Sequence, residues 1–145
     1  MNILRFIIPK SLVQTLSVES TVRQASETMI YHRYTALPVL DTDGRYLGTV
    51  RSDDLFRYYF ERQHPKRDEK DNVMHAVDPH YLKPLPHDAP FERLMEEVVE
   101  HNFVPVVDDR GCFIGIILRR EILGHLLKFY RERKDSHNQA SQKIT

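Results

Sequence analysis

The sequence predicts an α/β (α+β) protein built from two copies of one small unit, related by a pseudo-twofold axis. Each unit is expected to hold a small, mainly three-stranded sheet and two packed helices. An internal repeat carries this prediction, because the block 37–55 matches the block 104–122 at a constant offset of 67 residues. In addition, helical and strand patterns follow the same order in both copies. Because a repeated unit folds alike each time, the two copies are expected to pack against each other. The pseudo-symmetric seam between them is where a ligand could bind.

The elements of the first copy follow from local patterns. Apolar residues at helical spacing, with Ser20 or Thr21 as the cap of the first turn, predict a helix over 21–33. The short apolar run 37–40 predicts a strand, ended by a turn in which Gly44 supplies a positive φ. Residues 46–50 form the returning strand. A second helix follows over 53–61, with its apolar residues on one face.

The second copy repeats this order with a helix over 91–99, strands over 104–107 and 113–117, and a helix over 121–133. One further strand is expected before the first helix of each copy, over 11–16 and 81–85. Gly48 lies inside a predicted strand, which indicates a bulge or a close approach of another group to the backbone.

The domain organisation follows from these elements. We expect a first repeat over 7–62, a linker over 63–74, a second repeat over 75–132 and a polar tail over 133–145. The connection 62–71 is polar and mixed in charge, as expected of a surface segment. The tail is expected to be frayed.

Composition excludes several classes of function. The 145 residues include 21 basic and 21 acidic ones, so the net charge of zero argues against nucleic acid or an anionic membrane as a partner. No apolar run approaches the roughly 18 residues of a membrane span, and the apolar start is too short for a signal peptide. Cys112 is the only cysteine, which excludes an internal disulfide and a thiolate metal cage. We therefore expect a cytoplasmic protein.

Two motifs point to a family. Leu37-Pro38-Val39-x-Asp41 and Val104-Pro105-Val106-x-Asp108 are each followed by glycines and then by an acidic residue that opens a helix. This order resembles the cystathionine-β-synthase (CBS) domain, and two copies resemble a Bateman module, the tandem pair that packs as a pseudo-twofold disc. The resemblance covers roughly residues 7 to 130. In addition, residues 6–11 and 102–109 resemble segments of stand-alone CBS-pair proteins of low-GC Gram-positive bacteria.

The resemblance implies a regulatory function without catalysis. Members of the family bind AMP, ADP, ATP, cyclic di-AMP or S-adenosylmethionine in two clefts between the paired copies. An aspartate holds the ribose hydroxyls, and a threonine or serine three residues earlier contacts phosphate. A carboxylate suits this role because it can accept two hydroxyl hydrogen bonds, and a helix N-terminus offers N–H groups to phosphate. No cofactor is required beyond this regulatory nucleotide, and an effector protein would read the bound state.

The resemblance places candidate ligand-binding residues in both copies. In the first copy they are the ribose-binding Asp54, with Arg51 in the place of the hydroxyl residue, and Thr49, Ser52, Tyr34, Thr35, Ala36 and Gln14. In the second copy Glu121 replaces the aspartate and Leu118 the hydroxyl residue. The other candidates there are Lys83, Asn102, Phe103, Ile116 and Arg119.

Simpler interpretations stay open for several of these residues. Capping of a helix explains Asp54 as well as ribose binding does. A lone arginine such as Arg51 is usually solvated, although it could hold a phosphate. Arg119 opens a helix, where a cation opposes the helix dipole, so either an anion partner or a solvated surface explains it. Ile116 and Leu118 are expected in the core or the cleft wall.

Other functions remain as alternatives. The chain could be an interaction module whose clefts have lost their ligand, as the replacements at positions 51, 118 and 121 suggest. It could also be a regulator linked to metal or nucleic acid, although the eight histidines form no recognised ligand pattern. No nucleophile–base pair or phosphate-binding loop indicates an enzyme. We expect a homodimer formed through aromatic residues of the terminal helices: Tyr59, Phe60, Phe129 and Tyr130.

Overall fold

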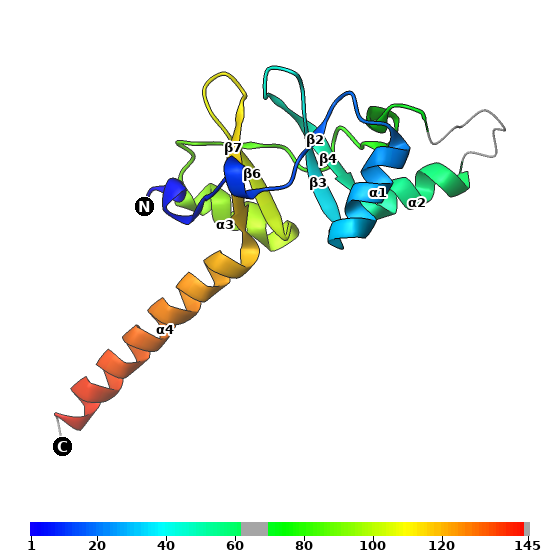
Figure 1. Ribbon diagram of the computed structural model, residues 1–145. Coiled ribbons are helices and arrows are strands. Elements are labelled where there is room, and N and C mark those ends of the chain that lie inside the picture. The colour runs from blue at the N-terminus through cyan, green and yellow to red at the C-terminus, as the bar shows by residue number, and fades with distance from the viewer. Residues whose placement is uncertain (62–69, 144–145) are drawn as a thin grey trace.

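The computed structural model describes residues 1–61 and 70–143. Within them, the chain forms two small sheets side by side, each covered by helices (Figure 1). The first sheet has the strand order β2 (Leu16–Ser17), β3 (Ala36–Leu40), β4 (Tyr46–Arg51). The second has the order β1 (Ile8–Pro9), β7 (Phe113–Leu118), β6 (Phe103–Val107), β5 (Leu85–Pro86). The helices are α1 (Val22–His32), α2 (Ser52–Glu61), α3 (Phe91–Glu100) and α4 (Arg119–Gln142). The predicted fold class is confirmed.

Local signals set the helices and turns of the first repeat. Thr21 caps α1 through a reciprocal box, in which its hydroxyl accepts from the Gln24 N–H at 3.1 Å and the Gln24 side chain accepts from the Thr21 N–H at 2.9 Å. The β3–β4 turn ends at Gly44, with a φ of 83°, as the sequence predicts.

Gly48 confirms both predictions made for it. The register between β3 and β4 shifts next to its partner Val39, which marks a bulge. A Cβ at this position would lie 2.8 Å from the Val77 side chain, so only glycine leaves room for that segment.

The two repeats meet at their β-turns through reciprocal hydrogen bonds. The Tyr46 N–H donates to the Gly111 carbonyl at 3.1 Å, and the Phe113 N–H donates to the Gly44 carbonyl at 2.9 Å. Because Gly44 and Gly111, and Tyr46 and Phe113, are counterparts 67 residues apart, this pair of bonds is symmetric about the seam. The predicted pseudo-twofold relation therefore has a direct backbone basis.

The structure corrects the prediction of strands over 11–16 and 81–85. The structure has only the two-residue strands β2 and β5, each parallel to the Pro-Val strand of its repeat. Lys10–Leu12 turn as a short 3-10 helix, η2. On the other side, Pro84 and Pro86 lack the N–H groups that a longer ladder would need.

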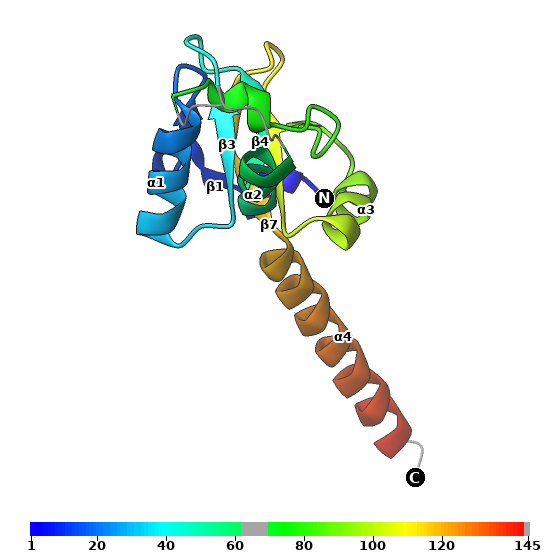
Figure 2. The same cartoon turned by 90° about the vertical axis from the view of Figure 1, so that its right-hand side faces the viewer.

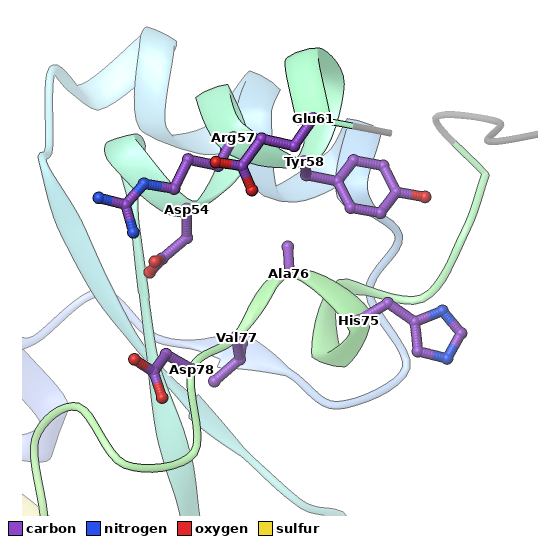
Figure 3. A pocket seen from close by; sticks show the side chains of 8 residues that line it. All are labelled: Asp54, Arg57, Tyr58, Glu61, His75, Ala76, Val77 and Asp78. Carbon is purple, nitrogen blue, oxygen red and sulfur yellow. The ribbon is translucent and has the colours of Figure 1, made fainter. Parts of the chain in front are cut away.

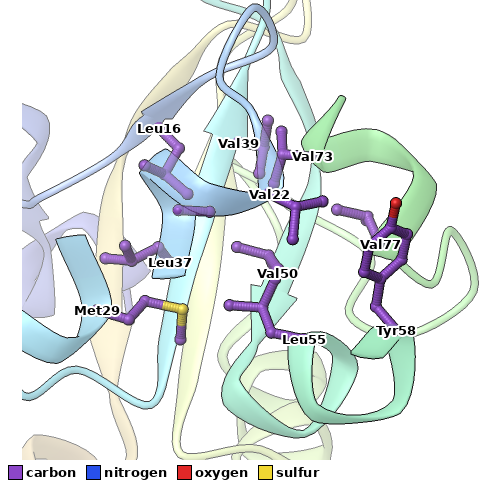
Figure 4. Close-up of a cluster of buried hydrophobic side chains, with 11 residues drawn as sticks. Leu16, Val22, Met29, Leu37, Val39, Val50, Leu55, Tyr58, Val73 and Val77 are labelled. Atoms are coloured by element: carbon purple, nitrogen blue, oxygen red, sulfur yellow. The ribbon is translucent and has the colours of Figure 1, made fainter. Parts of the chain in front are cut away.

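The segment that precedes each repeat, its leading segment, packs into the core of the other repeat. Ile3 lies in the 3-10 helix η1 (Ile3–Phe6) and is fully buried in the core of the second repeat, where β1 pairs with β7. Conversely, Val73 lies in the 3-10 helix η3 (Val73–Ala76) and, with Val77, completes the core of the first repeat (Figure 4). The two repeats are therefore interlocked rather than merely adjacent.

The structure also corrects the expectation of a frayed polar tail after residue 132. Helix α4 continues to Gln142 and extends away from the sheets (Figures 1 and 2). Apart from Ile122, which is fully buried, few of its residues touch the core. The connection over 62–69, part of the predicted surface segment, lies outside the described residues. No helix among the described residues is long and apolar enough to cross a membrane.

Candidate functional site

An open cleft lies at the seam between the repeats. Its volume is about 340 Å³, within the range of about 300–1,000 Å³ of small-molecule sites. Of the residues predicted from the sequence, it brings together Gln14, Tyr34, Ala36, Phe103, Ile116 and Leu118. The remaining lining is apolar and comes from Ile8, Leu12, Val13, Leu37 and Pro38.

This cleft combines elements of both repeats. Tyr34 and Ala36 come from the start of the Pro-Val strand of the first repeat, whereas Ile116 and Leu118 come from β7 of the second. The wall is therefore apolar, with the Gln14 amide and the Tyr34 phenol as its polar side chains. Such a lining suits a flat aromatic group better than a bare anion.

Thr35 and Asn102 are predicted site residues that do not line the open cleft. Their carbonyls instead fix the starts of two helices. The Thr35 carbonyl accepts from the Ser52 N–H at 2.9 Å, and the Asn102 carbonyl accepts from the Arg119 N–H at 2.8 Å. These bonds are counterparts, and they hold each helix start beside the cleft edge.

A second group of predicted residues gathers on the other side of the seam, around β4. Thr49 is 1% exposed, and its hydroxyl lies 2.7 Å from the Tyr46 hydroxyl. The Tyr46 hydroxyl donates in turn to the Leu82 carbonyl at 2.8 Å. Burial raises the pKa of Tyr46 to about 12, although the Thr49 hydrogen bond acts in the opposite direction.

Asp54 is buried and bound by a single neighbour, Arg51. Its Oδ2 accepts from the Arg51 backbone N–H at 2.8 Å and from Arg51 Nε at 3.1 Å, and its Oδ1 accepts from Arg51 Nη2 at 2.9 Å. Asp54 is the third residue of α2 and not its N-cap, but its carboxylate reaches back to the N–H that precedes the helix and so satisfies a donor at the helix start.

Arg51 is partly buried and has partners, so the interpretation of a lone, solvated arginine is wrong. Its guanidinium carbon lies 3.7 Å from the centroid of the Tyr81 ring. The hydrogen bond with Asp54 raises the pKa of Arg51 above its ordinary value. Tyr81 and Tyr46 are the residues that sequence reasoning missed here.

Arg119 also has partners. Its Nε donates to the Val98 carbonyl at 2.6 Å and its Nη2 to the Val99 carbonyl at 3.2 Å, so it caps the end of α3. Lys83, Ser52 and Glu121 are exposed. Glu121 lies in the first turn of α4, where a carboxylate favours the helix dipole.

A smaller polar hollow of about 160 Å³ lies between α2 and η3, lined by Asp54, Arg57, Tyr58, Glu61, His75, Ala76, Val77 and Asp78 (Figure 3). Its charges are mixed. Within residues 1–61 and 70–143, no three histidine, cysteine or acidic side chains are grouped to hold a metal ion.

The fold and the cleft define a class, the pair of pseudo-symmetric α+β repeats with ligand-sized space at the seam. The CBS domain family model matches residues 8–61 and 77–128, which is most of the chain. The chain therefore belongs to the CBS domain family, and the resemblance inferred from its motifs is confirmed.

Several known proteins are similar to this chain over most of its length. Cyclic di-AMP receptor B of Bacillus subtilis is 26% identical over 130 residues, covering 88% of this chain and 87% of the receptor. Among solved structures, CbpB in complex with c-di-AMP has a TM-score of 0.83 at 20% identity, covering 94% of this chain and 91% of CbpB. CBSX2 in complex with AMP has a TM-score of 0.73 at 24% identity, covering 89% of this chain and 98% of CBSX2. These structural likenesses establish the fold.

Other curated relatives are much longer. UPF0053 protein YugS of Bacillus subtilis is 25% identical over 130 residues, which are 89% of this chain and 29% of YugS. The chain likewise spans 20% and 23% of two archaeal homoserine O-acetyltransferases. The chain thus matches a part of these proteins that occupies less than a third of their length.

Proposed function

We propose that this chain is a non-catalytic regulatory module that binds an adenine nucleotide in the open cleft. The observation that carries the proposal is the cavity of about 340 Å³, lined by both repeats at their seam. Ala36 leaves room for a planar base, Ile116 and Leu118 supply apolar walls, and Tyr34 offers an aromatic face. Nothing in this lining resembles an acid–base pair, which supports binding without turnover.

The relatives narrow the class of ligand. One curated relative is a cyclic di-AMP receptor, and similar solved structures hold c-di-AMP or AMP. AMP, ADP, ATP and cyclic di-AMP are therefore the candidates for this chain. We propose that Glu121, the counterpart of Asp54, receives the ribose hydroxyls at the edge of the open cleft.

Ligand binding would change how the two repeats pack against each other. Because the cleft walls belong to different repeats, a ligand that binds one arrangement more tightly shifts the population toward it. An effector protein would read this shift. Adenine nucleotides are kept in the cytoplasm, so we expect the protein to act there.

The exposed aromatic residues on the helices support a homodimer. Tyr59 and Phe60 on α2 are 47% and 70% exposed, and Phe129 and Tyr130 on α4 are 57% and 64% exposed. Tyr59 also lines an apolar groove of about 410 Å³ between α1 and α2. We propose that a second copy covers it.

A thermal-shift panel of AMP, ADP, ATP, cyclic di-AMP and S-adenosylmethionine tests the nucleotide proposal. A ligand at 100 times its Kd stabilises the protein by about 2.7 kcal/mol, a readily visible shift. We expect one ligand to act, and Ala36→Leu, which fills the cleft, to abolish the response. Thr35→Val is the matched control, because its side chain does not line the cleft. Chromatography should recover the nucleotide intact after incubation.

An interaction module without a ligand is the second candidate. Leu118 in the place of the hydroxyl residue favours it, because an apolar side chain cannot bind phosphate. Flat titrations with every nucleotide of the panel would support this candidate and exclude the nucleotide proposal.

A further inference from the structure

The two sides of the seam differ, although the repeats are symmetric. On the open side, Leu118 faces a cavity of about 340 Å³. Its counterpart 67 residues earlier is Arg51, which lies on the other side of the seam, the second cleft. Arg51 is opposite Ala36 in the β3–β4 register, as Leu118 is opposite Phe103 in the β6–β7 register. The comparison between the clefts is therefore residue for residue.

Two polar side chains of the second cleft, Thr49 and Asp54, are already hydrogen-bonded within the chain. The hydroxyl of Thr49 is bonded to that of Tyr46, which also reaches the Leu82 carbonyl. The carboxylate of Asp54 accepts three hydrogen bonds from Arg51 alone. A ligand entering this cleft would have to replace these bonds.

Arg51 also lies on the Tyr81 ring, where the base of a nucleoside could stack. Its guanidinium is planar, lies 3.7 Å from the Tyr81 ring centroid and hydrogen-bonds a carboxylate at the same time. Its side chain is 26% exposed, whereas that of Asp54 is 5% exposed, so the cation covers the carboxylate from solvent. A nucleoside in the same place would stack its base and offer its ribose hydroxyls to the same carboxylate.

We propose that Arg51 is an internal occupant of the second cleft and limits the chain to one bound nucleotide, held in the open cleft. This inference rests on the proposed function for its first site, but the occlusion of the second is a separate property. Arg51 is thus a residue that determines stoichiometry rather than a phosphate contact.

The test exchanges the residues at positions 51 and 118. Isothermal titration calorimetry with AMP and, separately, with cyclic di-AMP measures the number of nucleotides bound per chain. The wild-type chain should bind one nucleotide per chain. Arg51→Leu should bind two, and Leu118→Arg, which puts the same bulk in the open cleft, should bind none. The double exchange should bind one, and adding Asp54→Asn to it should abolish that binding, whereas Asp54→Asn alone should leave binding in the open cleft unchanged.

Arg51→Leu leaves a buried carboxylate without its cation, so its folding is checked by circular dichroism. If it does not fold, Arg51→Lys replaces it, because lysine keeps the charge beside Asp54 but has no planar face for Tyr81. Two nucleotides per wild-type chain, or no second site in the folded variant, would overturn the inference. Failure of the open cleft looks different: the wild-type chain binds nothing, whereas Arg51→Leu binds one.

Discussion

Tyr46 and Phe113 stack on each other across the pseudo-twofold axis, with ring centroids 6.4 Å apart and planes inclined by 23°. They are counterparts in the two repeats, and their backbone N–H groups donate to the opposite turns. Only Tyr46 carries a hydroxyl, and this group ties β4 to the Leu82 carbonyl. Within this stacked pair the symmetry is therefore broken by one oxygen atom, on the side where the cleft is filled.

Removing that oxygen should destabilise the fold. Tyr46→Phe leaves the Thr49 hydroxyl and the Leu82 carbonyl without their shared partner, and we expect a loss of about 1–3 kcal/mol in the free energy of unfolding. Urea denaturation measures it. Tyr31→Phe is the control, because Tyr31 is 82% exposed and its change should be within about 0.5 kcal/mol. Equal effects of the two substitutions would contradict the role given to the Tyr46 hydroxyl.

The raised pKa of Tyr46 predicts a loss of stability in alkali. Its pKa is about 12 in the folded chain and about 10 in the unfolded chain, so folding favours the protonated phenol. This contribution is complete below pH 10 and is lost as the pH rises toward 12. The stability advantage of the wild-type chain over Tyr46→Phe should therefore shrink between about pH 10 and 12. An advantage that stays constant over that interval would show that Tyr46 is not perturbed.

The two strand glycines should differ in their tolerance of a methyl group. A Cβ at Gly115 would lie 2.2 Å from the Ile8 carbonyl oxygen, whereas a Cβ at Gly48 would meet a Val77 side chain at 2.8 Å. Backbone cannot move aside as a side chain can, so we expect Gly115→Ala to cost about 3 kcal/mol and Gly48→Ala about 1. Thermal unfolding of both variants gives the comparison. Similar losses would mean that β1 shifts freely on β7.

Gly115→Ala should also weaken the ligand site. Ile8 and Ile116 are partners in the β1–β7 register and both line the open cleft, so displacing β1 alters its wall. We expect a lower nucleotide affinity in Gly115→Ala than in Gly48→Ala, measured by titration calorimetry under conditions where both are folded. Unchanged affinity in Gly115→Ala would place the ligand elsewhere.

Elements that depend on neighbouring residues could be predicted from the sequence. The turn at Gly44 is complete within a few residues and appears as predicted. For the cap of α1 the sequence offers Ser20 or Thr21; the structure uses Thr21, whose reciprocal bond with Gln24 was not predicted. Helix α4 was underestimated because its end is polar. The segment 134–142, however, contains lysine, alanine and two glutamines without glycine or proline, which permits a solvated helix.

The packing of each leading segment into the opposite repeat depends on tertiary contacts, but a second repeat pattern in the sequence is consistent with it. Asn2 and Asn72 both cap a 3-10 helix, accepting from the N–H groups of Leu4 and Met74 at 2.9 Å. Asn2, Ile3 and Ile7 match Asn72, Val73 and Val77 at an offset of 70 residues, which lies outside the block aligned at 67. This second offset could have extended the repeat to the start of the chain.

The site was predictable as a region but not as a set of contacts. Motif positions placed Ala36, Ile116 and Leu118 at the seam, and the structure brings them together in the open cleft. The contact of Arg51 with Tyr81 depends on packing between segments 30 residues apart in the chain, for which no local pattern exists.

The proposed dimer predicts which single charges should dissociate the protein. Phe56 is 62% exposed beside the α1–α2 groove, and Leu127 is 48% exposed on α4. A stable interface buries about 800 Å² on each partner, so a buried glutamate in its apolar centre is strongly unfavourable. We expect Phe56→Glu, Leu127→Glu or both to sediment as monomers at concentrations where the wild-type chain is a dimer.

Asn138→Glu is the matched control, because it adds the same charge to the exposed polar end of α4 and should leave the dimer intact. The pair of substitutions also identifies the helices involved. Dissociation by Phe56→Glu alone would assign the interface to α1 and α2, and dissociation by Leu127→Glu alone would assign it to α4. A wild-type chain that sediments as a monomer at micromolar concentration would refute the dimer, and the exposed aromatic surface would then be available to the effector protein.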